Sequence, residues 1–231
     1  MRAGMWSESR NARNVLGVAA VVATLVLLGG CEVPRVSPAN PGTGRAEASA
    51  VPEIPVAEAR KLLGELPVAV RGVLDGYDRA RKFPQWKTVS GRGDVREELL
   101  KRDGTNVKVN AECAAVSGSW RSPYDGKTWT TASDVDVDHV VPLAHAWVSG
   151  AKSWDQATRE RFANDLTQPQ LRPVTDNLNQ DKGDKAPDQW KPPLVSYWCT
   201  YATDWVMVKH AYALTITVPE RTALSSMLDR C

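Results

Sequence analysis

The stretch Asp134-Val135-Asp136-Val137-Asp138-His139-Val140-Val141-Pro142 decides the fold and places an acid directly before a histidine. Valines at alternate positions predict a short strand that is buried on one face. Pro142 cannot donate a hydrogen bond to a neighbouring strand, so we expect the strand to end about there. A regular strand would direct Asp138 and His139 to opposite faces, and the two share a site only if the strand ends or curls at His139.

A second segment gives this Asp–His pair a chemical context. About forty residues after His139, a predicted strand over 171–174 leads into a helical segment that carries Asn179 and Lys182, with Thr175 or Asp176 as its cap. A histidine with a pKa near about 6.5 is a natural general base at neutral pH. Acid and amide oxygens suit a hard divalent cation whose shell water completes. These residue types match the needs of phosphodiester hydrolysis, namely an activated water and stabilisation of the developing charge.

Periodicity, capping boxes and turn dipeptides predict the remaining elements. Helices are expected over 56–66, 95–102, 143–148, 153–164, 198–212 and from 217 to near 231, and short strands over 107–109 and 114–116. The predicted capping boxes are Ser153 with Gln156 and Thr217 with Glu220, and the predicted turns are Ser117–Gly118 and Asp125–Gly126. We interpret the apolar stripe within 198–212 as core and not as a base-stacking surface. The fold class predicted is α+β with small β-elements.

The N-terminal region has the order of a bacterial lipoprotein leader. Three arginines precede the apolar or small run Val15–Leu28, which has the length of a signal-peptide core and is short for a membrane span. The run ends in Leu-Gly-Gly-Cys31, which resembles a lipobox, so Cys31 is the predicted lipidation site and lipid anchor to the membrane. An ordinary secretory signal or a single-pass anchor is the alternative. We expect a signal peptide over 1–30, a Pro/Ala/Gly/Ser-rich tether over 31–55 and one domain over 56–231, outside the cytoplasm.

Charge argues against a broad basic surface for nucleic acid. Residues 1–30 hold three of the 29 basic and one of the 27 acidic residues, so the mature part has a formal charge of zero. A broad basic field that holds nucleic acid is therefore not expected, although a local groove is compatible with this balance.

The chain has four cysteines, namely Cys31, Cys113, Cys199 and Cys231. With Cys31 lipidated, three remain, and Cys199 and Cys231 lie on the two terminal helical segments, which a disulfide can bridge. Cys113 would then be a free thiol. No Cys-x-x-Cys pair supports a structural zinc site.

Several motifs, in order along two thirds of the chain, resemble secreted bacterial HNH endonuclease-family proteins, which are related to the C-terminal domain of GmrSD-type restriction enzymes. The segments that carry the resemblance are Asp138–His139 in its strand, Asn179-x-x-Lys182, Tyr77-x-Arg79, Phe83-Pro84-x-Trp86, Asp94-x-Arg96, Tyr124-x-Gly126-Lys127, Ala146-Trp147-x-x-Gly150-Ala151, Lys182-Gly183-Asp184 and the C-terminal cysteine. The resemblance implies a ββα-metal core with flanking helices and short β-hairpins. It also implies a metal-dependent endonuclease acting on DNA, RNA or both.

The resemblance assigns roles residue by residue. His139 would be the general base, and Asp138 and Asn179 would hold the metal, which we expect to be Mg²⁺, with Mn²⁺, Ca²⁺, Ni²⁺ or Zn²⁺ as alternatives. Lys182 would contact phosphate or brace the helix. Asp94 and Arg96 would support the site.

Two departures from the family pattern bear on the site. Gln170 stands where the family has an Asn that steadies the loop, and Gly93 replaces a cysteine, which would leave Cys113 without a partner. Asp134 and Asp136 are interpreted as solvated strand acids. His145 and His210 receive no role, although His145 lies close enough in sequence to reach the cleft.

Two other function classes compete with a nuclease. One is a binding lipoprotein that keeps the fold without activity, which Gln170 and the neutral charge favour and the joint presence of Asp138, His139 and Asn179 disfavours. The other is a zinc peptidase, against which the absence of His-Glu-x-x-His argues. Nucleic acid and the membrane are the partners expected, and no protein partner is inferred.

Overall fold

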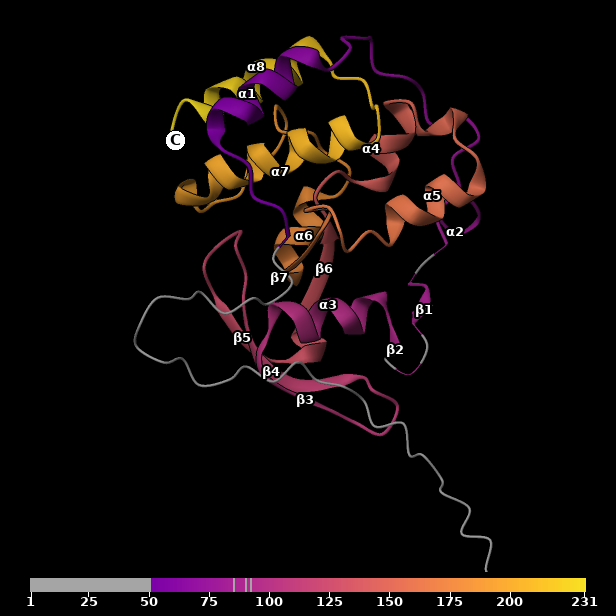
Figure 1. Ribbon diagram of the computed structural model, residues 1–231, viewed down its shortest axis with the longest axis vertical. Coiled ribbons are helices and arrows are strands. Elements are labelled where there is room, and N and C mark those ends of the chain that lie inside the picture. The colour runs from indigo at the N-terminus through magenta and orange to yellow at the C-terminus, as the bar shows by residue number, and fades with distance from the viewer. Residues whose placement is uncertain (1–50, 85, 90, 92) are drawn as a thin grey trace, which may run out of the picture.

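The computed structural model describes residues 51–231 apart from 85, 90 and 92, and its fold is α+β, as predicted. Figure 1 shows a cluster of helices at one end, a small sheet with one helix at the other, and the strands β6 and β7 with helix α6 between them. The predicted signal peptide, most of the tether and the lipidation site Cys31 lie outside the described residues. No helix within the described ranges is long and apolar enough to cross a membrane.

The helical end is built on α7 (Trp198–Ala211), which packs against both α1 (Val56–Glu65) and α8 (Val218–Leu228). The predicted apolar stripe of α7 is core: Ala202, Trp205 and Val208 are fully buried. The capping box at the start of α8 is also confirmed, because the Thr217 side chain accepts from the backbone of Glu220 and the Glu220 side chain accepts from the backbone of Thr217.

The strand predicted around the Asp–His pair is β6 (Val135–His139), and it pairs antiparallel with β7 (Leu171–Thr175). The register runs without interruption from Val135 opposite Thr175 to His139 opposite Leu171. Helix α6 (Asp176–Lys182) follows β7 directly and packs on β6. Because β6 stays regular through its last residue, neighbouring side chains on it alternate between the two faces.

The other end of the molecule holds the sheet β3 (Thr105–Val109), β4 (Ala115–Arg121) and β5 (Thr128–Thr131) beside α3 (Val95–Asp103). Trp120 is fully buried there, and its indole nitrogen donates to the Leu100 carbonyl at 2.8 Å. The Ser117–Gly118 turn prediction is wrong, because both residues lie inside β4. Gly118 meets a packing need instead: a Cβ at this position would lie 2.8 Å from the Trp120 ring.

Five short elements complete the fold. These are α2 (Arg79–Lys82), β1 (Thr88–Val89), β2 (Gly93–Asp94), α4 (Leu143–Val148) and α5 (Gln156–Ala163). The predicted Ser153 capping box is wrong. Ser153 ends a 3₁₀ turn over 151–153 and donates to the Gly150 carbonyl, so Asp155 caps α5 by accepting from the Thr158 backbone at 2.7 Å.

The disulfide between Cys199 and Cys231 is confirmed, with Cα atoms 5.4 Å apart, and it ties the start of α7 to the C-terminus. The prediction that Cys113 is a free thiol is wrong, because Cys113 is disulfide-bonded. Its partner is not among the residues that the structure describes. The absence of a cysteine at Gly93 therefore did not leave Cys113 unpaired.

Candidate active site

His139, the last residue of β6, is held in one orientation by two contacts. Its Nε2 lies 2.9 Å from the Ala163 carbonyl oxygen, and its ring stacks parallel to Trp86 at a centroid distance of 5.5 Å. A carbonyl only accepts, so Nε2 carries the proton in this bond and the lone pair of the neutral ring is on Nδ1. Burial lowers the pKa of His139 to about 3. The side chain is therefore neutral at physiological pH and keeps an unprotonated nitrogen, Nδ1.

Asp138 faces the opposite side of β6, as the alternation of a regular strand requires. Its carboxylate accepts from the Tyr124 hydroxyl and from Lys182 Nζ, which lies 2.9 Å from Oδ1 and 2.8 Å from Oδ2. Only 4% of Asp138 is exposed, and burial raises its pKa while the Lys182 ammonium opposes the rise. With both oxygens engaged by donors in a buried pair, Asp138 is a poor candidate for a metal ligand.

Lys182 contacts both of the last two residues of β6, Asp138 and His139. Its ammonium is fully buried and also donates to the His139 main-chain carbonyl at 2.9 Å. A buried Nζ with these partners has no open path to a phosphate. Of the two roles expected for Lys182, this geometry favours bracing the strand end against α6.

Asn179 is paired with Asp136 and not with Asp138. Asn179 Nδ2 donates to Asp136 Oδ2 at 3.0 Å, one turn before Lys182 along α6. Burial raises the pKa of Asp136, and the neighbouring carboxyl of Asp176 at the start of α6 contributes to that rise. Asp136 is half-buried and not solvated as expected, whereas Asp134 is exposed as expected.

This acid–amide cluster, defined as Asp136, Asp176 and Asn179, fits a hard divalent cation. Two adjacent carboxylates repel each other, and a cation between them relieves the repulsion. Carboxylate and amide oxygens are the ligand types such cations take. The described part of the chain holds no group of three or more His, Cys, Asp or Glu side chains placed to bind a metal, so a site here depends on the amide and on water.

Gln170 holds the loop after β6 in place, although it stands where the family has the shorter Asn. It is fully buried, its Nε2 donates to the Val141 carbonyl at 2.9 Å, and its Oε1 accepts from the Val141 backbone at 3.1 Å. Its own carbonyl accepts from Val140 at 2.7 Å. The longer amide therefore ties the segment after His139 to the start of β7.

Asp94 and Arg96 support the site from α3. Asp94 caps that helix by accepting from the Glu97 backbone at 3.0 Å. Arg96 donates to the carbonyls of Ala132 at 2.9 Å and Val135 at 3.2 Å, which fixes the entry into β6. Arg96 positions the strand and Asp94 caps the helix that carries Arg96; neither touches His139 in the contacts the structure gives.

Three residues of the candidate site were not predicted from the sequence. Tyr124 and Trp86 belong to motifs that carry the family resemblance but were assigned no role, although Tyr124 bonds Asp138 and Trp86 stacks on His139. Asp136 is predicted to be a solvated strand acid, although it shares a face of β6 with Asp138 at a spacing of two residues. That spacing was the available signal, because it places both acids toward the helix that carries Asn179 and Lys182.

The burial of His139 gives a pH dependence of stability with a defined sign. The unfolded ring takes a proton near pH 6.5, whereas the folded ring does so only near about 3, so stability is full above 6.5 and falls as the pH drops toward 3. When the pH falls from 7 to 4.5, His139 lowers the free energy of unfolding by about 2–3 kcal/mol. His139→Phe, which keeps a ring against Trp86, should reduce the loss by that amount in urea titrations. Equal losses in both proteins would contradict the assignment.

Comparison with known proteins identifies the family to which this fold and this site belong. Residues 94–227 match the family described as "GmrSD restriction endonucleases, C-terminal domain", and the chain belongs to this family. The match covers β6, β7 and α6 and includes every candidate-site residue described in this subsection except Trp86. It indicates a nuclease-related function.

One curated relative is described as an "Uncharacterized secreted protein" of the fungus Arthroderma benhamiae. It is 59% identical over 181 residues, which is 78% of this chain and 88% of the relative. The relative suggests an extracellular location. Because it is fungal, it does not carry the bacterial part of the resemblance. No solved structure matches the chain significantly.

Proposed function

We propose that this protein is an extracellular, metal-dependent endonuclease of the HNH type that hydrolyses phosphodiester bonds of DNA, RNA or both. The observation that carries the proposal is the state of His139: neutral, stacked on Trp86, and tethered through Nε2 to a carbonyl so that Nδ1 holds the lone pair. A general base for water needs this protonation state and a fixed orientation.

His139 then removes the proton from the attacking water at Nδ1, while the Ala163 carbonyl stabilises the ring that becomes charged. A divalent cation, when bound, supplies Lewis-acid polarisation of the phosphate and stabilises the leaving oxygen. Asp136, Asp176 and Asn179, on the face of β6 opposite to the His139 ring, are the residues that would hold it, so the cation and the base would approach the phosphodiester from different sides of the strand. Asp138 and Lys182 form the buried pair that fixes where β6 ends and therefore where His139 stands.

A positive charge near the base is available for the substrate. The exposed Arg79 has a small electrostatic effect on both Asp138 and His139 that favours a lower pKa of each, although burial dominates both pKa values. Arg79, and not the buried Lys182, is the residue we assign to neutralising the scissile phosphate.

Metal titration of cleavage tests the ligand assignment. Asp136→Asn removes a negative charge beside Asn179 and should raise the metal concentration for half-maximal activity by about tenfold or more, because one carboxylate fewer binds the cation. Saturating metal should restore most of the rate. Asp134→Asn, in the exposed turn directly before β6, is the matched control. An unchanged metal requirement in Asp136→Asn would remove Asp136 from the ligand set.

Lipid attachment at Cys31 stays a separate proposal within the extracellular location. The chain has four cysteines; Cys199 and Cys231 bond to each other, and Cys113 is also in a disulfide. A lipid thioether on Cys31 and a disulfide from Cys31 to Cys113 exclude each other. Mass mapping of unreduced peptides decides between them: a lipid-modified Cys31 peptide supports the anchor, and a peptide linked to Cys113 contradicts it.

A further inference from the structure

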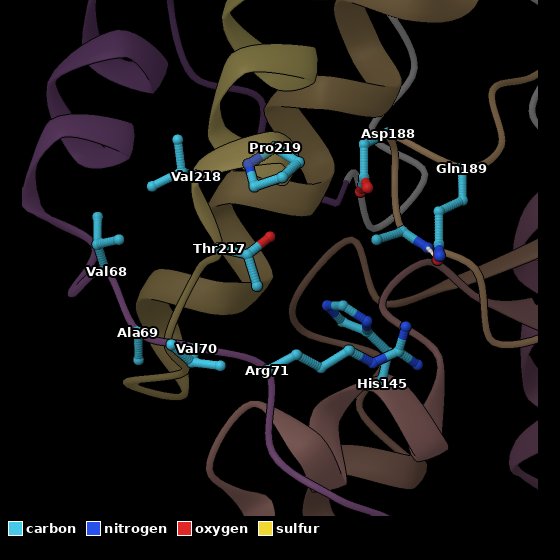
Figure 2. Close-up of a pocket in the computed structure, with 11 residues that line it drawn as sticks. Val68, Ala69, Val70, Arg71, His145, Asp188, Gln189, Thr217, Val218 and Pro219 are labelled. Atoms are coloured by element: carbon cyan, nitrogen blue, oxygen red, sulfur yellow. Dashed lines mark hydrogen bonds between the residues drawn. The ribbon is translucent and has the colours of Figure 1, made fainter.

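A pocket of about 590 Å³, away from the candidate active site, lies among α8, α4 and the segments over 68–71 and 186–189. None of its lining residues belongs to the acid–amide cluster or contacts His139 in the structure. Figure 2 shows Val68, Val218 and Pro219 on one side, with Arg71 and His145 together at the base. The pocket therefore combines an apolar wall with a basic end.

The wall is unusually apolar for a protein surface. Val70 is 93% exposed, Val218 63% and Val68 47%, and all three line this pocket. The segment that carries Val68 and Val70 is held in place, because Ala69 donates to the Ile216 carbonyl at 3.0 Å and Gly72 donates to the Val148 carbonyl at 2.9 Å. An ordered, exposed apolar surface of this kind is typical of a binding site.

At the base, His145 has a buried nitrogen with no partner. Only 1% of His145 is exposed, and its Nδ1 makes no hydrogen bond in the structure. Its Nε2 lies 3.0 Å from Lys209 Nζ and 3.3 Å from Glu220 Oε1. Leaving a buried polar atom without a partner costs free energy, so such an atom needs an explanation.

The proton on His145 can be assigned from Lys209. The three shortest contacts of the fully buried ammonium are Glu220 Oε1 at 2.6 Å, the Thr215 carbonyl at 2.8 Å and His145 Nε2 at 3.0 Å. Glu220 Oε1 lies 2.6 Å from the ammonium but 3.3 Å from Nε2, so the ammonium is the closer partner of Nε2. Because an ammonium has three protons and no lone pair, we infer that Nε2 accepts and that the proton of the neutral ring is on Nδ1. The unpartnered atom is therefore a donor, and an acceptor on a ligand that enters the pocket beside His145 would satisfy it.

Arg71 adds a positive charge beside this donor. Its guanidinium is paired only loosely with Asp184, at 3.6 Å between exposed side chains, so a ligand can compete for it. Its field lowers the pKa of His145 and of Lys209, in agreement with its place at the base of the pocket. Asp188, the one acid in the lining, stands away from Arg71 in Figure 2.

We propose that this pocket binds a small amphiphilic acid, whose carboxylate pairs with Arg71 and accepts from His145 Nδ1 while its apolar body lies against Val68, Val218 and Pro219. Burial of the body removes apolar surface from water on both partners. The carboxylate supplies the acceptor that His145 lacks and a charge-assisted bond to the guanidinium. The site is separate from the proposed nuclease centre and does not depend on nuclease activity.

Histidine-selective NMR tests the proposal directly, because the chain has three histidines. Protein labelled with ¹⁵N at histidine is titrated with sodium hexanoate, and His139→Phe and His210→Gln assign the rings by elimination. We expect the free protein to show His145 protonated on Nδ1 and hexanoate to shift this signal saturably. Arg71→Gln should weaken hexanoate binding about tenfold, and 1-hexanol should bind at least about tenfold more weakly than hexanoate.

Arg60→Gln is the matched control, since Arg60 is another exposed arginine in a surface pair, with Asp229, outside the pocket. It should leave hexanoate binding unchanged. A His145 ring protonated on Nε2, or no saturable shift by hexanoate in the folded protein, would overturn the proposal. Equal binding of hexanol and hexanoate would also overturn it, because the pocket would then lack selectivity for an anion.

Discussion

Replacing His139 by Ala is expected to lower the rate of phosphodiester cleavage by roughly 10²–10⁴-fold, the usual cost of removing a general base. The loss should persist at saturating metal, because no cation replaces the proton acceptor at Nδ1. Added imidazole should restore part of the rate, since the ring leaves a space beside Trp86. The measurement is cleavage of plasmid DNA and of RNA across a metal titration.

Two controls separate this loss from damage to the fold. His210→Ala removes an exposed histidine that pairs with Glu65 at 3.0 Å, far in sequence from β6, and should cleave like the wild type. Metal affinity of His139→Ala, measured without substrate, should be unchanged. A His139→Ala protein as active as the wild type would remove His139 from the role of base.

Replacing Asp138 by Ala is expected to destabilise the protein by roughly 3–5 kcal/mol, because it leaves the buried Lys182 ammonium without its counter-charge. The effect should appear as a lower free energy of unfolding in denaturant titrations. Adding Lys182→Met to Asp138→Ala should recover a substantial part of the loss, since the unpaired charge is then gone. Asp136→Asn, two residues earlier on β6, should stay close to wild-type stability.

This comparison also distinguishes the structural assignment from the one made on sequence resemblance. If Asp138→Ala keeps wild-type stability but needs more metal for cleavage, Asp138 is the metal ligand and the acid–amide cluster is not the site. If Asp138→Ala unfolds easily and Asp136→Asn needs more metal, the buried pair is structural and the cluster binds the cation.

Local patterns were enough to predict most elements of the fold. The alternating valines gave β6, the helical spacing of apolar residues gave α1 and α7, and the Thr217–Glu220 capping box gave the start of α8. The failures were at places where distant packing overrides local chemistry. Ser117–Gly118 lies within β4 because the Trp120 ring needs the space at Gly118, a requirement that no local pattern shows.

The sequence predicted which residues belong to the site better than it predicted which of them contact one another. Asn179 and Lys182 do contact β6, but the register of β6 on β7 decides which acid each of them contacts. A regular strand end places Asp138 against Lys182 and leaves Asp136 to Asn179. That register depends on pairing between segments about forty residues apart, and sequence periodicity alone does not fix it.

Digestion of supercoiled plasmid and of single-stranded RNA by the purified wild-type protein, with and without EDTA, tests the central claim most directly. We expect cleavage in the presence of Mg²⁺, Mn²⁺, Ca²⁺, Ni²⁺ or Zn²⁺, abolished by EDTA and restored when metal is added in excess. A folded protein that cleaves neither substrate with any of these cations, or that cleaves equally well in EDTA, would contradict it.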